Sequence, residues 1–325
     1  MRGRQTMFVK RFDEISKEMV QECGGKAAHL GELTSLKLCV PNGFVVLAEA
    51  FSHHVRDNKL EEQIQNIVTT INYDDYMDLE EKTRQIRSLI INAPMPLEIE
   101  REIIGNYATL SDGPKDPFVA IRSSVAVKDS PISSFPGMMD TFHYIKGAQD
   151  VVEKVKECWA SVWSGRAAFS RHFKGIEHMK AMIAPTIQLM VNSEVAGVLF
   201  TVNPITGSKE EIVIESNWGL GETVVCGKCQ SDLYIMNKSP IQIKDKRIAR
   251  KEQTFIQAKG GGAEWVPVEP DRVNKPTLTE KQIEELCRIA CSIEEHYGCH
   301  QDIEWAYEKG SLYILQARRA KAGGE

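Results

Sequence analysis

Two short runs near the end of the 325-residue sequence read Gln301-Asp302-Ile303-Glu304-Trp305-Ala306 and Leu315-Gln316-Ala317-Arg318. Polar and apolar residues alternate in both runs, which is typical of half-buried β-strands. The residues between them form a turn around 308–310, so the sequence predicts a β-hairpin. If the loop of this hairpin consists of residues 309–311, Glu304 lies directly opposite Gln316.

Directly opposed side chains on one face of a hairpin are close enough to share a ligand. A carboxylate at Glu304 and an amide oxygen at Gln316 suit Mg²⁺, which takes a few hard oxygen ligands from protein and the rest from phosphates and water. Arg318 adds a planar cation suited to phosphate. The hairpin is therefore either part of a site for a Mg²⁺-bound polyphosphate or an ordinary amphipathic hairpin with a surface glutamate.

The composition is that of a globular protein and excludes several classes of partner. The formal net charge is −5, which gives no indication of nucleic acid or an anionic membrane as a partner. No apolar run approaches the roughly 20 residues that a membrane span needs. Residues 1–10 are basic but lack the apolar core of a signal peptide, so a cytoplasmic location is expected.

The eight cysteines are expected to be reduced thiols in a cytoplasmic chain. Cys226-Gly-Lys-Cys229 has the spacing of a redox pair or of half a zinc site. Cys287 and Cys291 lie one helical turn apart and would complete a tetrad, although their apolar neighbours also fit a packed helix. A zinc or redox module therefore stays open as an alternative.

Helical and strand patterns alternate irregularly along the chain, without regular βαβ units, which predicts an α+β fold. Residues 148–173 have the pattern of one long amphipathic helix. Residues 279–297 form a second helix, with Thr279 and Gln282 at the spacing of a capping box. Residues 233–237 and 241–248 are predicted to be neighbouring strands of a meander.

The sequence contains neither a Walker A motif nor a Rossmann fingerprint. Lys26 instead follows two glycines near the start of a helix, where N–H groups and a cation can meet an anion. Arg122 and Arg318 each end a predicted strand and are either surface residues or parts of a phosphate clamp. The loop at 128–140, rich in hydroxyl groups and containing glycine, suits a lid over phosphates or an idle surface loop.

Taken together, these motifs resemble the ATP-binding N-terminal domain of phosphoenolpyruvate synthase and pyruvate phosphate dikinase, also found in rifampicin phosphotransferase. The resemblance covers about residues 8–318. The matching stretches are Gly24-Gly25-Lys26-Ala-Ala-His-Leu-Gly31, Val40-Pro41-Asn42-Gly43-Phe44, Ile121-Arg122-Ser123-Ser124, Gly137-Met138-Met139-Asp140-Thr141, Gln188-x-Met190-Val191, Gly197-Val198-Leu199-Phe200-Thr201, Trp218-Gly219-Leu220-Gly221-Glu222, His296-Tyr297-Gly298, Asp302-Ile303-Glu304-Trp305 and Leu315-Gln316-Ala317-Arg318.

The resemblance implies an ATP-grasp fold of two α+β lobes with the nucleotide in the cleft between them. The expected lobes are residues 1–192, with a helical insertion and the phosphate lid, and residues 193–325, with the Mg²⁺-binding hairpin. The residues that the resemblance assigns to ATP are Lys26, Arg122, Gly137, Asp140, Thr141, Gln188, Met190, Val191, Asp302, Glu304, Gln316 and Arg318.

Within that set the resemblance also implies individual roles. Lys26 and Arg122 are expected to contact the phosphates and, with Arg318, to act in catalysis. Glu304 and Gln316 are expected to hold Mg²⁺. Residues 188–191 are expected to line the adenine, and residues 137–141 to cover the phosphates.

The departures from the family pattern bear on function. No stretch matches the family's phosphohistidine motif or its pyruvate-binding barrel, and position 319 is Arg where the family usually has Pro. We therefore expect a natural stand-alone subunit that uses Mg-ATP to phosphorylate a histidine on a separate partner, giving AMP and phosphate. The final acceptor would be phenol, as in a split phenylphosphate synthase, or pyruvate. The alternative is a non-catalytic ATP-sensing regulatory module of the same fold.

Overall fold

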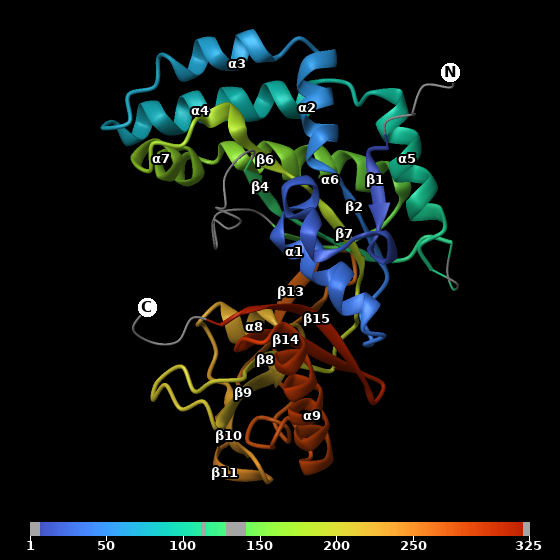
Figure 1. Cartoon of the computed structure of the whole chain (residues 1–325), viewed down its shortest axis with the longest axis vertical. Coiled ribbons are helices and arrows are strands. Elements are labelled where there is room, and N and C mark those ends of the chain that lie inside the picture. Colours follow the sequence, from blue (N-terminus) through green and yellow to red (C-terminus); the bar gives the residue numbers. More distant parts are fainter. Residues whose placement is uncertain (1–6, 112, 114, 128–140, 321–325) are drawn as a thin grey trace. The chain divides into compact units, whose positions relative to one another are not determined.

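A computed structural model describes residues 7–111, 113, 115–127 and 141–320 of the chain (Figure 1). The chain divides into two compact units. The first comprises residues 1–35 and 42–190, and the second comprises residues 36–41 and 191–325. Residues 36–41 belong with the second unit, where Ile314 donates its N–H to the carbonyl of Cys39 at 2.9 Å.

The first unit is built on an antiparallel five-stranded sheet. In spatial order its strands are β1 (Val9–Arg11), β2 (Gly43–Val46), β7 (Thr186–Leu189), β3 (Val119–Arg122) and β5 (Thr141–Ile145). Two shorter strands, β4 (Val125–Val127) and β6 (Ala181–Ile183), pair with each other. The order is not sequential, so segments far apart in the chain become neighbours.

Helices cover this sheet and bury an apolar core. They are α1 (Val20–Ser35), α2 (Ala48–Asp57), α3 (Glu61–Val68), α4 (Tyr76–Asn92), α5 (Leu97–Ala108), α6 (Ala148–Ala160) and α7 (Gly165–Phe173). Helix α6 packs on β3 and β5, and α4 lies over α6 (Figure 1). No helix in the described part of the chain is both long and apolar enough to cross a membrane.

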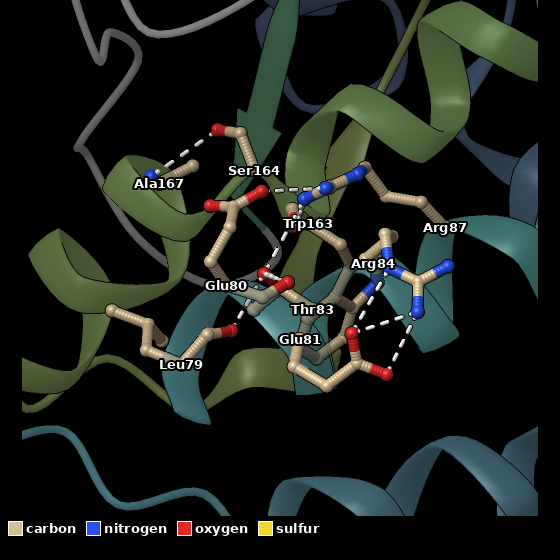
Figure 2. A network of polar contacts seen from close by, with 9 residues as sticks. All are labelled: Leu79, Glu80, Glu81, Thr83, Arg84, Arg87, Trp163, Ser164 and Ala167. Carbon is tan, nitrogen blue, oxygen red and sulfur yellow. Dashed lines mark hydrogen bonds and ion pairs between the residues drawn. The ribbon is translucent and has the colours of Figure 1, made fainter. Parts of the chain in front are cut away.

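The single helix predicted over residues 148–173 is wrong, because the chain breaks between α6 and α7. A 3-10 turn at Ser161–Trp163 ends the first helix, and Ser164 begins the second by accepting the N–H of Ala167 at 3.3 Å. Figure 2 shows why the break persists: Arg87 of α4 donates to the carbonyl of Trp163 at 2.9 Å and to Glu80 at 2.7 Å. The carbonyl of Trp163, at the end of the buried 3-10 turn, thereby gains a hydrogen-bond partner.

A stack of aromatic and cationic side chains holds the segment after α7. His178 lies 2.8 Å from the hydroxyl of Tyr73 through Nε2, and its Nδ1 accepts from Arg171 Nε at 3.3 Å. Arg171 is only 1% exposed, and its guanidinium also lies over the ring of Trp163. Burial, and secondly the charge of Arg171, lower the pKa of His178 to about 4 from its ordinary 6.5. The geometry therefore holds a neutral imidazole.

The second unit is built on an antiparallel six-stranded sheet. In spatial order its strands are β11 (Ile241–Arg247), β10 (Asp232–Lys238), β9 (Glu211–Trp218), β8 (Val195–Phe200), β14 (Gln301–Glu308) and β15 (Ser311–Arg319). The predicted meander is confirmed as β10 and β11. A separate hairpin, β12 (Gln253–Gln257) with β13 (Ala263–Pro267), follows in sequence.

Helix α9 (Glu280–Tyr297) packs on β10, β11 and β14 of this sheet, and the short helix α8 (Glu222–Val225) on β8 and β9. The predicted capping box of α9 is confirmed, since Thr279 accepts the N–H of Gln282 while Gln282 accepts the N–H of Thr279. The hydroxyl of Tyr307 on β14 donates to Glu285 at 2.7 Å. One face of the hairpin is thereby fixed against α9.

A fully buried ion pair ties the connection after β11 to the sheet. Lys251 and Asp232 are both 0% exposed, and Lys251 Nζ lies 2.6 Å from Asp232 Oδ1. The same carboxylate accepts the backbone N–H groups of Ala249 and Thr277, and the Thr277 hydroxyl donates to it as well. Lys251 also donates to the carbonyl of Ala249 at 2.8 Å, so each charge has more than one partner in an interior that would otherwise penalise it.

Removing one member of this ion pair is expected to lower the free energy of unfolding substantially. Lys251→Met leaves the Asp232 carboxylate buried without its cation and should lower the free energy of unfolding by about 3–5 kcal/mol. Lys275→Met, which removes an exposed lysine from a 2.9 Å pair with Asp271, should cost at most about 1 kcal/mol. Denaturant unfolding of both variants measures the difference, and equal losses would contradict this account.

The lowered pKa of His178 gives stability a dependence on pH. Because the folded chain binds this proton only near its pKa of about 4, the unfolded chain binds it first as pH falls below 6.5. The stability that the neutral His178 contributes is complete above pH 6.5, and it is lost as the pH falls from 6.5 to about 4. His178→Gln should therefore gain stability relative to the parent chain between about pH 7 and about pH 5. A difference that stays constant in urea unfolding across this range would be inconsistent with a neutral imidazole.

Candidate functional site

The hairpin of β14 and β15 places the predicted Mg²⁺ residues opposite each other, by a route that the sequence did not indicate. The turn has two residues, Lys309 and Gly310, with φ angles of 50° and 78°, so the expected three-residue loop is wrong. Glu308 pairs with Ser311, and the register then shifts between Glu304 and Trp305. Glu304 consequently pairs with Gln316, as predicted.

The register shift is a β-bulge that decides which way the second strand points its side chains. Trp305 pairs with Ile314 while Glu304 pairs with Gln316, so Leu315 is the extra residue on β15. Without it Glu304 would face Leu315, and Gln316 would point to the opposite face of the sheet. With it, four side chains share one face, namely Asp302, Glu304, Gln316 and Arg318.

Asp302 and Arg318 form an ion pair at the end of this face. Arg318 donates from Nε at 2.8 Å and from Nη2 at 2.7 Å to Asp302 Oδ2. Burial raises the pKa of Asp302, Arg318 opposes that shift, and the charge of Glu304 adds to it. The side chain of Arg318 remains 57% exposed, so part of the guanidinium also faces solvent.

Gln316 supplies an oxygen for which the described chain offers no hydrogen-bond donor. Its side chain is 6% exposed, and Oε1 is buried without a partner. A buried acceptor without a donor costs roughly 1–3 kcal/mol. Directly opposite stands the carboxylate of Glu304, and a carboxylate with an amide oxygen is a donor set that Mg²⁺ accepts. These residues therefore fit the metal.

Glu215 on β9 was missed from the sequence although it shares this face. Glu304 pairs with Val198 on β8, and Val198 pairs with Glu215, so Gln316, Glu304 and Glu215 lie in one row across the sheet. Burial raises the pKa of Glu215. Its position after a run of three apolar residues within a predicted strand was the signal that could have identified it.

The first unit presents the two other predicted cations. Arg122 ends β3 and pairs with Thr141 on β5 and with Thr186 on β7, so these three side chains share a row. Thr186, which the sequence did not single out, is fully buried, and its hydroxyl has no hydrogen-bond partner among the described residues. Lys26 lies in α1, just after a backbone break at Gly24.

The residues expected around the adenine are divided between the two units, and part of the expected phosphate lid is not described. Gln188 on β7 is 3% exposed and pairs with Gly43 and Ala120. Met190 ends the first unit and donates its N–H to the carbonyl of Phe118, whereas Val191 begins the second unit and packs in its apolar core. Gly137 and Asp140 of the expected lid lie outside the described residues.

The zinc and redox alternatives gain no support. No group of three or more His, Cys, Asp or Glu side chains is arranged to hold a metal ion within the residues that the structure describes. Cys287 is buried in α9, and burial raises the pKa of its thiol to about 12. Burial also raises the pKa of Cys229, whereas a reactive thiol needs a lowered pKa.

The chain thus comprises two α+β units, one carrying Lys26 and Arg122 and the other carrying Glu304, Gln316 and Arg318. Comparison with known families shows to which class these units belong. The chain belongs to the family "Pyruvate phosphate dikinase, AMP/ATP-binding domain", whose profile matches residues 20–325. The resemblance inferred from the sequence and the ATP-grasp fold it implies are thus confirmed.

Several similar proteins are named as phosphoenolpyruvate synthases. The chain is 42% identical over 319 residues to a probable phosphoenolpyruvate synthase of Methanocaldococcus jannaschii, covering 98% of this chain and 27% of that protein. It is 40% identical over 353 residues to the phosphoenolpyruvate synthase of Pyrococcus furiosus, covering 96% of this chain and 43% of that protein. The chain thus spans less than half the length of these relatives.

The oxygen of Gln316, for which residues 7–111, 113, 115–127 and 141–320 supply no donor, predicts an unusual response to substitution. Gln316→Leu removes a buried acceptor without breaking a hydrogen bond, so the melting temperature without nucleotide should stay unchanged or rise. Gln282→Leu in the same unit breaks the capping box of α9 and should cost about 1 kcal/mol. Thermal melts of both variants decide the matter, and a comparable loss in Gln316→Leu would indicate a bonded amide.

Proposed function

We propose that this chain is the Mg-ATP-binding part of a dikinase-type phosphotransferase and acts on a histidine carried by a separate partner. ATP, water and the histidine give the phosphohistidine, AMP and inorganic phosphate. Membership of an ATP-binding family supports the use of ATP. The limited share of each relative that the chain spans supports an acceptor outside these 325 residues.

The observation that carries the proposal is the polar face of the hairpin in the second unit. It combines a ligand pair for a divalent cation, Glu304 with Gln316, and an arginine whose side chain is half-exposed beside it. Phosphoryl transfer needs little covalent work from the protein, because catalysis consists of positioning and of neutralising charge on phosphate oxygens. Mg²⁺, when bound, would supply part of that neutralisation.

The remaining proposed roles are those that the family resemblance implies. Lys26 and Arg122 bind phosphate oxygens, and Arg318 holds one further oxygen while its ion pair orients the guanidinium on Asp302. Gln188, Met190 and Val191 bind the adenine. Residues 137–141 cover the phosphates, with Thr141 at the start of β5 beside Arg122. None of these residues needs to exchange a proton in the transfer.

The final acceptor is chosen by the partner. The names of the relatives support pyruvate, which receives the phosphoryl group in a phosphoenolpyruvate synthase. Phenol is the corresponding acceptor if the chain is the ATP-binding subunit of a split phenylphosphate synthase. Because the residues assigned here bind only Mg-ATP, both acceptors are compatible with the same site.

Labelled ATP distinguishes this function from simple ATP sensing. With β-labelled ATP, label should appear on a histidine of the partner and AMP should form, whereas γ-labelled ATP should yield labelled phosphate. The chain alone should bind ATP but keep no stable label. Stable label on this chain would contradict the proposal. If the chain binds nucleotide but no AMP forms with any partner, the regulatory module is favoured.

Substitution of the hairpin carboxylate tests the metal role. Glu304→Gln keeps the size of the side chain but removes its charge, and should weaken Mg-dependent ATP binding by about tenfold or more, which is about 1.4 kcal/mol. Glu264→Gln, on the exposed face of the β12–β13 hairpin, is the matched control and should bind as the parent does. Titration calorimetry with a non-hydrolysable ATP analogue, with and without Mg²⁺, measures both, and equal affinities would exclude the assigned role.

A further inference from the structure

Helix α1 contains a break that leaves its second part without a capping side chain of its own. Gly24 has φ 72° and ψ 162°, which is not helical, so the helix that carries Lys26 begins afresh at Gly25. The first N–H groups of a helix have no partner within it, and an N-cap side chain usually accepts one of them. Gly24 occupies the N-cap position and has no side chain.

Ser124, which is far from α1 in the sequence and lies between β3 and β4, supplies the missing acceptor. The hydroxyl of Ser124, just after β3, accepts the N–H of Ala27 at 3.4 Å across 97 positions of sequence. Counted from Gly24 as the N-cap, Ala27 is the third helical residue, one of the two positions at which N-cap oxygens bind. Ser124 is 2% exposed and Ala27 is fully buried, so solvent offers little substitute for this bond.

The contact leaves no room for a side chain at position 24. A Cβ at position 24 would lie 2.2 Å from Ser124 Oγ, and the positive φ also favours glycine there. Ser124 itself is fixed through its backbone, because it donates to the carbonyl of Ala184 at 3.3 Å and accepts the N–H of Ala184 at 2.8 Å. The cap is therefore held at a defined point of the unit.

This single hydroxyl joins the two segments that carry the phosphate-binding cations of the first unit. Lys26 directly precedes Ala27, and Arg122 stands two residues before Ser124 at the end of β3. We infer that Ser124 is a positioning residue that caps the Lys26 helix in trans and so sets Lys26 relative to Arg122. The inference rests on the proposed function, in which both cations bind the phosphates of ATP.

A double-mutant cycle separates positioning from general stability. Ser124→Ala should weaken Mg-dependent binding of a non-hydrolysable ATP analogue by about three- to thirty-fold, the range that loss of a helix cap corresponds to. In a Lys26→Met background the same change should have less than about a twofold effect, because the residue that it positions is gone. An unchanged effect in that background would overturn the inference.

Two further variants serve as a control and as a substitute in case Ser124→Ala does not fold. Ser161→Ala removes another buried hydroxyl of the same unit, bonded to the carbonyl of Cys158 at 2.7 Å, and should leave ATP affinity unchanged. If Ser124→Ala does not fold, Ser124→Cys keeps a weak acceptor and fills the space, and should give a smaller loss in the same direction. If the Ser124 variant that is measured binds the ATP analogue as tightly as the parent does, the inference is also overturned.

Failure of this inference is distinguishable from failure of the proposed function. If the parent chain does not bind the analogue, or if Lys26→Met binds as the parent does, the proposed function fails. If Lys26→Met weakens binding but Ser124→Ala does not, the function stands and only the positioning role of Ser124 is wrong.

Discussion

The bulge at Leu315 is the constraint on which the polar face of the second unit depends. Side chains on a strand alternate between its two faces, so a shift of one residue moves every following side chain to the other face. The two-residue turn alone would direct Gln316 and Arg318 toward α9. One extra residue brings both beside Asp302 and Glu304, and the fold keeps a regular apolar face on the other side.

In both units, backbone geometry places polar side chains in partly buried positions, as for Asp302 and Gln316 in the second unit and Ser124 in the first. Asp302 keeps an ionic partner, whereas the amide oxygen of Gln316 finds no donor in the described part of the chain, which costs free energy in the absence of a ligand. In the first unit a fixed serine replaces an N-cap that glycine cannot provide. An acceptor such as the Gln316 oxygen costs stability locally and suits a site that gains the missing partner on binding.

Local signals in the sequence predicted several elements well. The capping box of α9 and the β10–β11 meander depend on residues a few positions apart, and both are confirmed. The break before α7 was missed although Ser164 carries an N-cap signal, because the helical periodicity continues across it. The loop length of the hairpin was also wrong, and the predicted pairing of Glu304 held only because the bulge compensates.

By itself the sequence determined the family, the α+β class and the residues proposed to bind ATP, since periodicity, caps and short motifs are local properties. Only the tertiary structure decided which of them share a face, as Glu215 does with Glu304 and Thr186 with Arg122. It also decided the cap of Ala27 by Ser124. The physical reason is that register, bulges and contacts across many positions of sequence depend on how strands pair and helices pack, which no local pattern encodes.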